Sequence, residues 1–127
     1  MMHWFALGMA LLVALAIIAI GILYLASPLT ATRSFGLPLP ENGAHIAWWL
    51  RLKGVRDIVS GLAVLALMMW GSSGAVGIIL LVEAFIPAGD MLVILAAKGS
   101  KTSAFGMHGL TAVIMVLAAV PLITGVA

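Results

Sequence analysis

The stretch that decides the fold is WFALGMALLVALAIIAIGILYLA, residues 4–26, which contains no charged side chain. A helix of this length, at about 1.5 Å per residue, is long enough to cross a hydrocarbon core of about 30 Å. A cleavable signal peptide is the competing interpretation. It is disfavoured because no Lys or Arg precedes the run and because the run is longer than the apolar part of a signal peptide. We therefore expect a transmembrane helix here.

The composition of the whole chain points to the same environment. Of the 127 residues, 65% are hydrophobic and only 8% are charged, and the mean hydropathy is +1.29. Soluble domains are about a quarter charged and about half apolar, and a water-soluble core of this size cannot hide so much apolar surface. The sequence thus predicts one domain, residues 1–127, whose outer surface is covered by the lipid bilayer.

Three further helices are expected after the first. They span residues 46–70, 75–97 and 104–126. Two short polar turns separate them, and short connections make consecutive helices antiparallel neighbours. The longest connection, residues 27–45, is rich in Pro and Gly and is expected to pack over the mouth of the bundle as a short lid. The predicted fold is all-α, an integral membrane four-helix transmembrane bundle.

The distribution of Lys and Arg predicts the orientation in the membrane. Arg33, Lys98 and Lys101 lie in the first and third connections, with Arg51 and Lys53 close to the same side, whereas the second connection and both termini carry no Lys or Arg. Cytoplasmic loops are enriched in these residues. Both termini are therefore expected on the non-cytoplasmic side, in a bacterial inner (plasma) membrane.

Ionisable residues inside the expected helices are candidates for a functional site, because each costs several kcal/mol in a bilayer unless it is paired or solvated. In the helix 46–70, four polar residues fall within an arc of about 100° at 100° per residue. They are Lys53, Arg56, Asp57 and Ser60. We expect this stripe to face the interior of the bundle, and Arg51 on the opposite side to lie at the interface.

The third and fourth helices add a second set. Glu83 and Asp90 are seven residues apart and share a face, with Pro87 between them. Proline removes a helical hydrogen bond, so the carbonyl of Glu83 is left free and a kink is expected. In the fourth helix, Thr111 shares the face of His108 within about 60°.

Antiparallel packing would bring these stripes together in the cytoplasmic half of the bundle, with Glu83 deepest. The candidate catalytic residues are Glu83, Asp90, Asp57 and His108, and the candidate substrate-binding residues are Arg56, Lys53, Ser60 and Thr111. The alternative is a structural network in which Arg56 pairs with Asp90 or Asp57 and His108 holds the fourth helix in register. Single interhelical hydrogen bonds in membranes contribute only about 1 kcal/mol, and Glu83 lacks an obvious cation, so this network would be an inefficient fastener.

Several kinds of site are excluded or disfavoured. The absence of cysteine excludes disulfides, cysteine-based metal sites and thiol catalysis. Six basic residues, separated along the chain, are too few to favour nucleic-acid binding. His3 and His45 fall on opposite sides in this topology and cannot share a metal. We therefore expect no metal site and no cofactor.

Three short segments carry a resemblance to a known group. They are residues 54–57 (GVRD), residues 87–90 (PAGD) and the pair His108-Gly109. The chain resembles the small four-helix integral membrane proteins of unknown function related to the DoxX-like superfamily, over nearly its whole length. The resemblance implies a four-helix fold. Some relatives in that superfamily are associated with quinone-linked or redox membrane systems, but the resemblance supplies no catalytic residues.

Three classes of function fit these features. The leading hypothesis is a membrane-embedded pocket for a small lipophilic molecule, isoprenoid- or quinone-like, in which buried carboxylates and an arginine do acid-base or electrostatic work. If it is an enzyme, which the sequence leaves uncertain, it is an isomerase, a cyclase or an epoxide-opening enzyme. The alternatives are a proton-coupled small transporter and a non-catalytic accessory subunit of a larger membrane complex. Whether the chain forms a homodimer also stays open.

Overall fold

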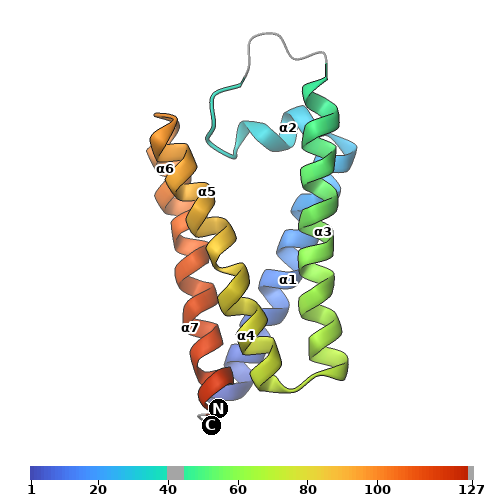
Figure 1. Cartoon of the computed structure of the whole chain (residues 1–127), viewed down its shortest axis with the longest axis vertical. Helices are drawn as coiled ribbons and strands as arrows, with labels where there is room; N and C mark the ends of the chain where they lie inside the picture. The colour runs from blue at the N-terminus through green and yellow to red at the C-terminus, as the bar shows by residue number, and fades with distance from the viewer. Residues whose placement is uncertain (40–44, 126–127) are drawn as a thin grey trace.

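The computed structural model describes residues 1–39 and 45–125, and these residues contain helices and no strand (Figure 1). The elements are α1 (Met2–Ala26), α2 (Pro28–Arg33), α3 (Ile46–Trp70), α4 (Ser73–Glu83), α5 (Phe85–Ala96), α6 (Lys101–Ser103), the π-helix η1 (Ala104–Gly109) and α7 (Leu110–Thr124). The helix predicted over 75–97 is therefore two segments, α4 and α5. The one predicted from 104 begins at 101 and includes a π-helical turn.

Within the described part of the chain, three helical stretches are long and apolar enough to cross a membrane. They are Met2–Ala26, Ser73–Ala96 and Lys101–Thr124. These stretches are those of an integral membrane protein in a lipid bilayer. The helix α3 is as long as α1, but every 18-residue segment of it contains three or four charged residues. It is therefore more polar than these three stretches.

The helices form two pairs. One pair is α1 with α3, and the other is α4 and α5 with η1 and α7. The pairs meet at the end of the molecule where both termini lie, through contacts of α1 with α7 and α4 and of α3 with α4 (Figure 1). The buried core lies at this end and consists largely of small side chains, among them Ala6, Ala10, Ala14, Ala118 and Ala119. From there the two pairs diverge toward the opposite end.

Glycines allow the α1–α3 pair to pack backbone against backbone. A Cβ atom at Gly21 would lie 2.6 Å from the carbonyl oxygen of Gly54, and one at Gly61 would lie 2.6 Å from the carbonyl oxygen of Ala14. Helices in lipid associate through such close approaches, because no hydrophobic force acts between them. The backbones of α1 and α3 are therefore packed close together.

The break between α4 and α5 lies beside the predicted proline. Pro87 has no amide hydrogen, so it cannot bind the carbonyl of Glu83 four residues earlier. The regular helix is interrupted at Ala84, directly after that residue. The other end of α4 begins in the short turn after α3, where the Ser72 hydroxyl oxygen accepts a hydrogen bond of 3.2 Å from the Ala75 amide and caps the helix.

The far end of the molecule is bridged by the connection that follows α1. This connection was expected to be irregular over 27–45, but its first part is the short helix α2, which crosses between the pairs (Figure 1). Residues 40–44 of the expected loop lie outside the described residues. After α2, three successive carbonyls, those of residues 34–36, accept hydrogen bonds from the other pair. We call residues 34–36 the strap.

The strap ties the first connection to the α6–η1 region. The Ser103 hydroxyl donates to the carbonyl of Ser34 at 3.2 Å, and the Ser100 amide donates to that of Gly36 at 2.8 Å. A nitrogen of His108 lies 3.0 Å from the carbonyl of Phe35. Gly36 has a φ of +106°, which only glycine adopts readily, and so lets the chain turn here.

Candidate functional site

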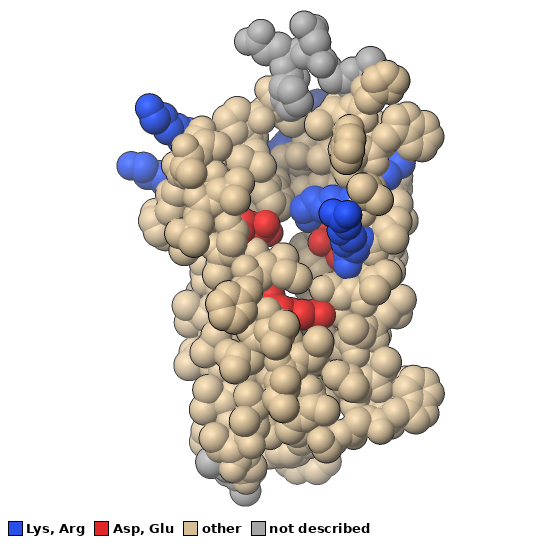
Figure 2. Space-filling model, viewed as in Figure 1, with Lys and Arg blue, Asp and Glu red and all other residues tan. Residues whose placement is uncertain are grey.

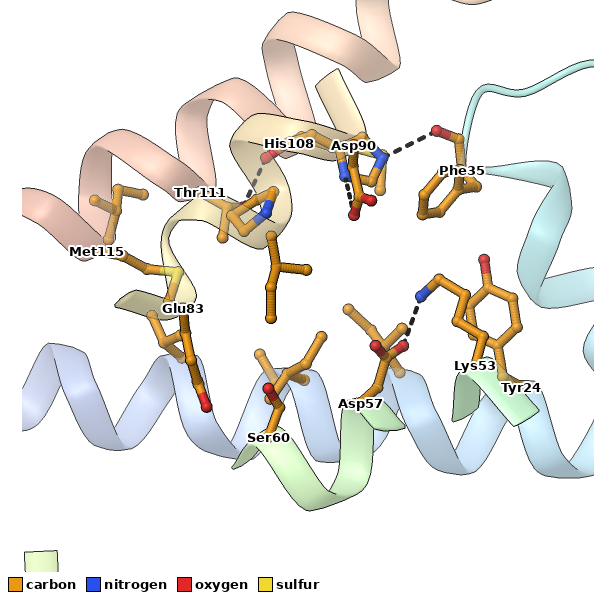
Figure 3. Close-up of a pocket in the computed structure, with 18 of the residues that line it drawn as sticks. Tyr24, Phe35, Lys53, Asp57, Ser60, Glu83, Asp90, His108, Thr111 and Met115 are labelled. Carbon is orange, nitrogen blue, oxygen red and sulfur yellow. Dashed lines mark hydrogen bonds and ion pairs between the residues drawn. The ribbon is translucent and has the colours of Figure 1, made fainter. Parts of the chain in front are cut away.

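A cavity of about 380 Å³ lies where the two helix pairs diverge, below the strap. Its apolar lining comes mainly from α1 and α7, and its charged groups come from α3, α4, α5 and η1. The polar groups that sequence analysis selected and that line it are Lys53, Asp57, Ser60, Glu83, Asp90, His108 and Thr111 (Figure 3). On the face shown in Figure 2, acidic and basic side chains gather around a hollow between α3 and α5.

The first polar pair stands on α3. The Lys53 ammonium lies 2.6 Å from a carboxylate oxygen of Asp57, one helical turn further along. The same ammonium lies 4.3 Å from the ring centre of Tyr24 and 5.1 Å from that of Phe35, within the range of cation–π attraction. The cation is thus held by one carboxylate and two aromatic faces at the upper wall of the cavity.

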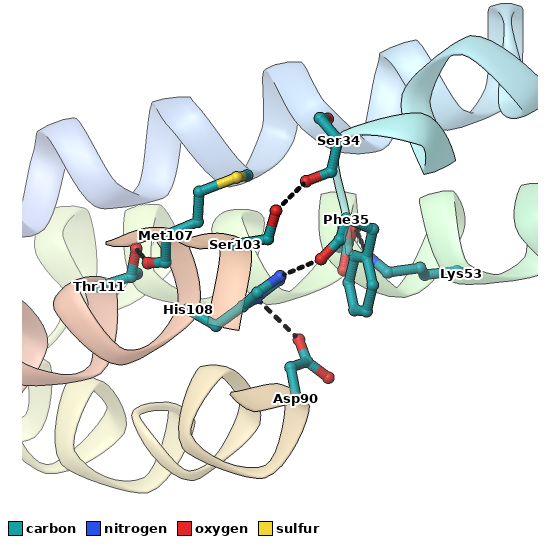
Figure 4. A network of polar contacts seen from close by, with 9 residues as sticks. Ser34, Phe35, Lys53, Asp90, Ser103, Met107, His108 and Thr111 are labelled. Carbon is teal, nitrogen blue, oxygen red and sulfur yellow. Dashed lines mark hydrogen bonds and ion pairs between the residues drawn. The ribbon is translucent and has the colours of Figure 1, made fainter. Parts of the chain in front are cut away.

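The second polar pair joins α5 to η1. The Nδ1 atom of His108 lies 3.6 Å from a carboxylate oxygen of Asp90, and Nε2 lies 3.0 Å from the carbonyl of Phe35 (Figure 4). A carbonyl oxygen can only accept, so Nε2 must carry a hydrogen. In neutral histidine Nδ1 would then be bare and would face the carboxylate. Both the bare Nδ1 and the Asp90 carboxylate would then be acceptors, so a hydrogen bond between them requires a proton on one of the two.

The π-helical turn brings His108 to this position. In a π-helix each turn holds an extra residue, which rotates the following side chains relative to a regular helix, and such turns are frequent at functional sites. Here η1 covers Ala104–Gly109 and buries His108. The Thr111 hydroxyl donates to the carbonyl of Met107 at 2.6 Å. Thr111 therefore lines the cavity, but its hydroxyl hydrogen is already used within its own helix.

Glu83 lies deeper than the two pairs. In Figure 3 the Glu83 side chain extends from α4 toward α3, so that its carboxyl group lies near the hydroxyl of Ser60. Among the described residues, Glu83 forms no ion pair. Glu83 is thus the acidic group of the cavity without a charged partner in the described part of the chain.

The prediction that Arg56 faces the interior is wrong. Arg56 is exposed and does not line the cavity. Consecutive residues of a helix are rotated by about 100°, and α3 turns Asp57 into the cavity and buries it. The predicted pairing of Arg56 with Asp90 or Asp57 is therefore absent from the described structure, and Lys53 provides the cation instead.

Arg51 lies outside the cavity, as expected. Its Nε donates to the carbonyl of Leu25 at 3.2 Å, and its guanidinium lies 5.0 Å from the ring centre of Trp48. Arg51 therefore joins the end of α1 to the start of α3.

Two aromatic residues of the site were missed as site residues from the sequence. The ring of Phe35 lies 4.5 Å from that of His108, centre to centre, and also contacts the Lys53 ammonium, while its carbonyl binds His108. Tyr24 supplies the other face of the cation site. Phe35 is the only Phe, Tyr or Trp in residues 27–45. Because this segment was expected to act as a lid, that single aromatic residue could have been predicted to contact the site.

The polar residues of the cavity do not form a cluster suited to a metal ion. The described residues contain no group of three or more His, Asp or Glu side chains that could hold one. Asp90 and His108 are close together, but the nearest additional charge is the Lys53–Asp57 pair.

The fold and this site define the class: a helical integral membrane protein with a partly polar cavity between two helix pairs. The chain belongs to the family described as a domain of unknown function, DUF4267, whose family model matches residues 14–122. The matched segment includes all the polar residues of the cavity. No curated protein and no solved structure gives a significant match.

Proposed function

We propose that the cavity binds a small lipophilic molecule and that the Asp90–His108 pair exchanges a proton with it. The observation that carries this proposal is the meeting of two acid-base pairs from different helices in one apolar cavity of about 380 Å³. Cavities that hold small molecules are typically of this size, mostly apolar, with a few convergent polar groups. An isoprenoid- or quinone-like molecule has the matching chemistry, an apolar body with few polar atoms.

The two pairs stand on opposite walls, so they can act on two positions of one ligand. The Asp90–His108 pair supplies a proton to one atom, and a carboxylate, that of Asp57 or Glu83, removes a proton from another. One proton is added and one is lost, so an isomerisation of a double bond balances without a co-reactant. Positioned acids and bases of this kind typically contribute about 10²–10⁴-fold to a rate. An isomerase is therefore the preferred form of the enzyme hypothesis, with cyclisation and epoxide opening as related acid-base reactions.

The proposal includes α3 as a fourth membrane-spanning helix. Trp48 and Trp70 stand 22 residues apart on α3, a distance of about 33 Å, and tryptophan is enriched at both membrane interfaces. The charges between them do not require lipid contact, because Asp57 is buried and Lys53 is paired with it. The exposed Arg56 can extend toward the nearer interface.

The orientation of the chain in the membrane is also part of the proposal. Arg33, Lys98 and Lys101 all stand at the end opposite the termini, which supports a topology with both termini on the non-cytoplasmic side. A bacterial inner membrane and a relationship to the DoxX-like superfamily stay predictions from the sequence.

Native mass spectrometry of the gently purified protein tests the proposal. Wild-type protein is compared with Asp90→Asn and Glu83→Gln, which alter the cavity, and with Arg56→Gln, which removes a charge outside it. We expect a co-purifying small molecule in the wild type and in Arg56→Gln, at an occupancy reduced at least tenfold in the two cavity variants. Size-exclusion chromatography selects folded protein in every case.

Absence of any bound molecule from folded wild-type protein would contradict the proposal. Equal occupancy in all four proteins would also contradict it, because the polar groups of the cavity would then contribute nothing to binding. The Arg56→Gln control separates a specific loss from a general effect of removing a charge from the membrane region.

A further inference from the structure

The two ends of the cavity are closed. Toward the termini, the helix pairs meet in the small-residue core, where Ala10, Ala14 and Ala119 are completely buried. Toward the loops, α2 and the strap cross from one pair to the other, and the three strap hydrogen bonds hold them there. A ligand that passed along the bundle axis would have to unpack the core or break the strap.

The two sides of the cavity are open. Along their described lengths, no Cα atom of α3 lies within 8 Å of one of α5, and no Cα atom of α1 lies within 8 Å of one of η1. Figure 1 shows the same separation of the two helix pairs above their common base. Side chains that line the cavity are exposed at these gaps, including Ile86 of α5 on one side. The α1–η1 gap lies between two stretches that are long and apolar enough to cross a membrane. With α3 as the proposed fourth span, both gaps face lipid.

The two openings differ in chemistry. At the α1–η1 opening, the large apolar side chains that line the cavity are 41% to 61% exposed, namely Leu12, Ile20, Leu23 and Met107. Thr111 is also exposed there, but its hydroxyl donates within its own helix. On the α3–α5 side, charged side chains surround the hollow (Figure 2). The two polar pairs lie between these openings, at the end of the cavity next to the strap (Figure 3).

We propose that the ligand is an amphiphile that enters from the bilayer through these side openings and lies across the cavity. Its polar group is held between the Lys53–Asp57 and Asp90–His108 pairs, and its apolar chain leaves between α1 and η1 into lipid. This inference rests on the proposed function and names the ligand class and its route. A chain that leaves through the apolar opening has no fixed length, so the cavity volume limits only the head of the molecule.

Cysteine labelling tests the route, because the chain contains no natural cysteine. Ser60→Cys places a thiol in the cavity, and Thr30→Cys places one on the exposed surface of α2 at the loop end. Each variant is reconstituted in liposomes and treated with a maleimide attached to a long acyl chain, or with a charged, membrane-impermeant maleimide present on both sides. We expect Ser60→Cys to react at least tenfold faster with the acyl reagent and Thr30→Cys to show the reverse preference.

A second substitution examines the apolar opening. Met107→Trp, added to Ser60→Cys, places a large ring in the gap between α1 and η1 and should slow the acyl reagent at least tenfold. Leu117→Trp is the matched control, since Leu117 is exposed on α7 but does not line the cavity. Equal slowing by both substitutions, or by neither, contradicts a route through this opening.

The remaining outcomes are also decisive. If Ser60→Cys reacts with the charged reagent as fast as Thr30→Cys does, the cavity opens to water at the loop end and the inference is wrong. It is also wrong if neither reagent modifies folded Ser60→Cys while both modify it after unfolding in SDS. Labelling requires no natural ligand, so side entry without a co-purified molecule refutes only the proposed function. A co-purified molecule with labelling by the charged reagent alone refutes only the route.

Discussion

Replacement of Gly54 by alanine should destabilise the protein through a single methyl group. The added Cβ would lie 2.7 Å from the carbonyl oxygen of Gly21 and 2.9 Å from the Cβ of Tyr24. Ordinary contacts of a Cβ atom begin near 3.4 Å, so the first distance is short by about 0.7 Å. The obstacle is largely backbone, so no side-chain rotation removes it, and α1 must move away from α3.

The expected cost follows from two opposing effects. Overpacking of a well-packed interior by an added methyl group costs about 1–3 kcal/mol. Alanine in the middle of a helix is favoured over glycine by about 0.5–1 kcal/mol, which offsets part of that cost. The midpoints of these two ranges leave a net decrease in the free energy of unfolding of about 1 kcal/mol for Gly54→Ala. Gly8→Ala is the matched control, since nothing lies within 4 Å of a Cβ atom there, and it should be neutral or stabilising by up to about 1 kcal/mol.

Reversible unfolding in mixed micelles of mild detergent and SDS, followed by circular dichroism, measures both variants against the wild type. The opposite signs expected for two chemically identical substitutions make the comparison sharp. A Gly54→Ala protein as stable as the wild type would refute the close α1–α3 approach. Equal destabilisation by Gly8→Ala would show that the effect is not specific to that contact.

Further predictions concern the polar pairs and the span. In a double-mutant cycle of Lys53→Met and Asp57→Asn, we expect a coupling energy of about 1–3 kcal/mol. Lys53→Met should be the more costly single substitution, because it leaves the Asp57 side chain, which is 12% exposed against 30% for Lys53, without its cation. A coupling energy of zero would contradict the ion pair. Ser103→Ala should lower the free energy of unfolding by about 0.5 kcal/mol, the low end for an exposed hydrogen bond, and an unchanged unfolding curve would argue against the strap. With Trp70 as the only tryptophan, lipids brominated near the headgroup should quench its fluorescence more than lipids brominated at the chain ends, and the reverse order would contradict an interfacial end of α3. In ¹⁵N NMR spectra of labelled histidine, Nε2 of His108 should be protonated, and a bare Nε2 would refute its hydrogen bond to the strap.

The helical architecture could be predicted from the sequence because it depends on properties that each segment carries alone. The charge-free run of residues 4–26 is apolar on every face, and Pro87 removes a helical hydrogen bond whatever lies beside it. The meeting of Glu83 and Asp90 with His108 likewise follows from helical periodicity and antiparallel packing. These features can therefore be predicted from the local sequence without knowledge of the tertiary contacts.

The rotation of α3 could not be predicted so well. Arg56 and Asp57 are adjacent, and a stripe about 100° wide includes both, so periodicity alone does not decide which one lies at its edge. The close glycine contacts with α1 fix the rotation, and they require the partner helix to be known. The π-helical turn around His108 depends on packing against α5 and was not predictable from residue spacing. The contact of Phe35 with two polar pairs arises from the strap, which tertiary hydrogen bonds hold in place.

The size of the cavity follows from how unequally the two ends of the fold are built. Alanines at the terminal end allow the helix pairs to touch, and larger side chains with charged groups occupy the other end, so the pairs diverge. The strap limits that divergence. Because the carbonyl of Phe35 binds the same histidine that faces Asp90, any change in the separation of the pairs also changes the geometry of the Asp90–His108 pair. Under the proposed function, entry of a ligand between the pairs would therefore act on this pair through one residue, His108.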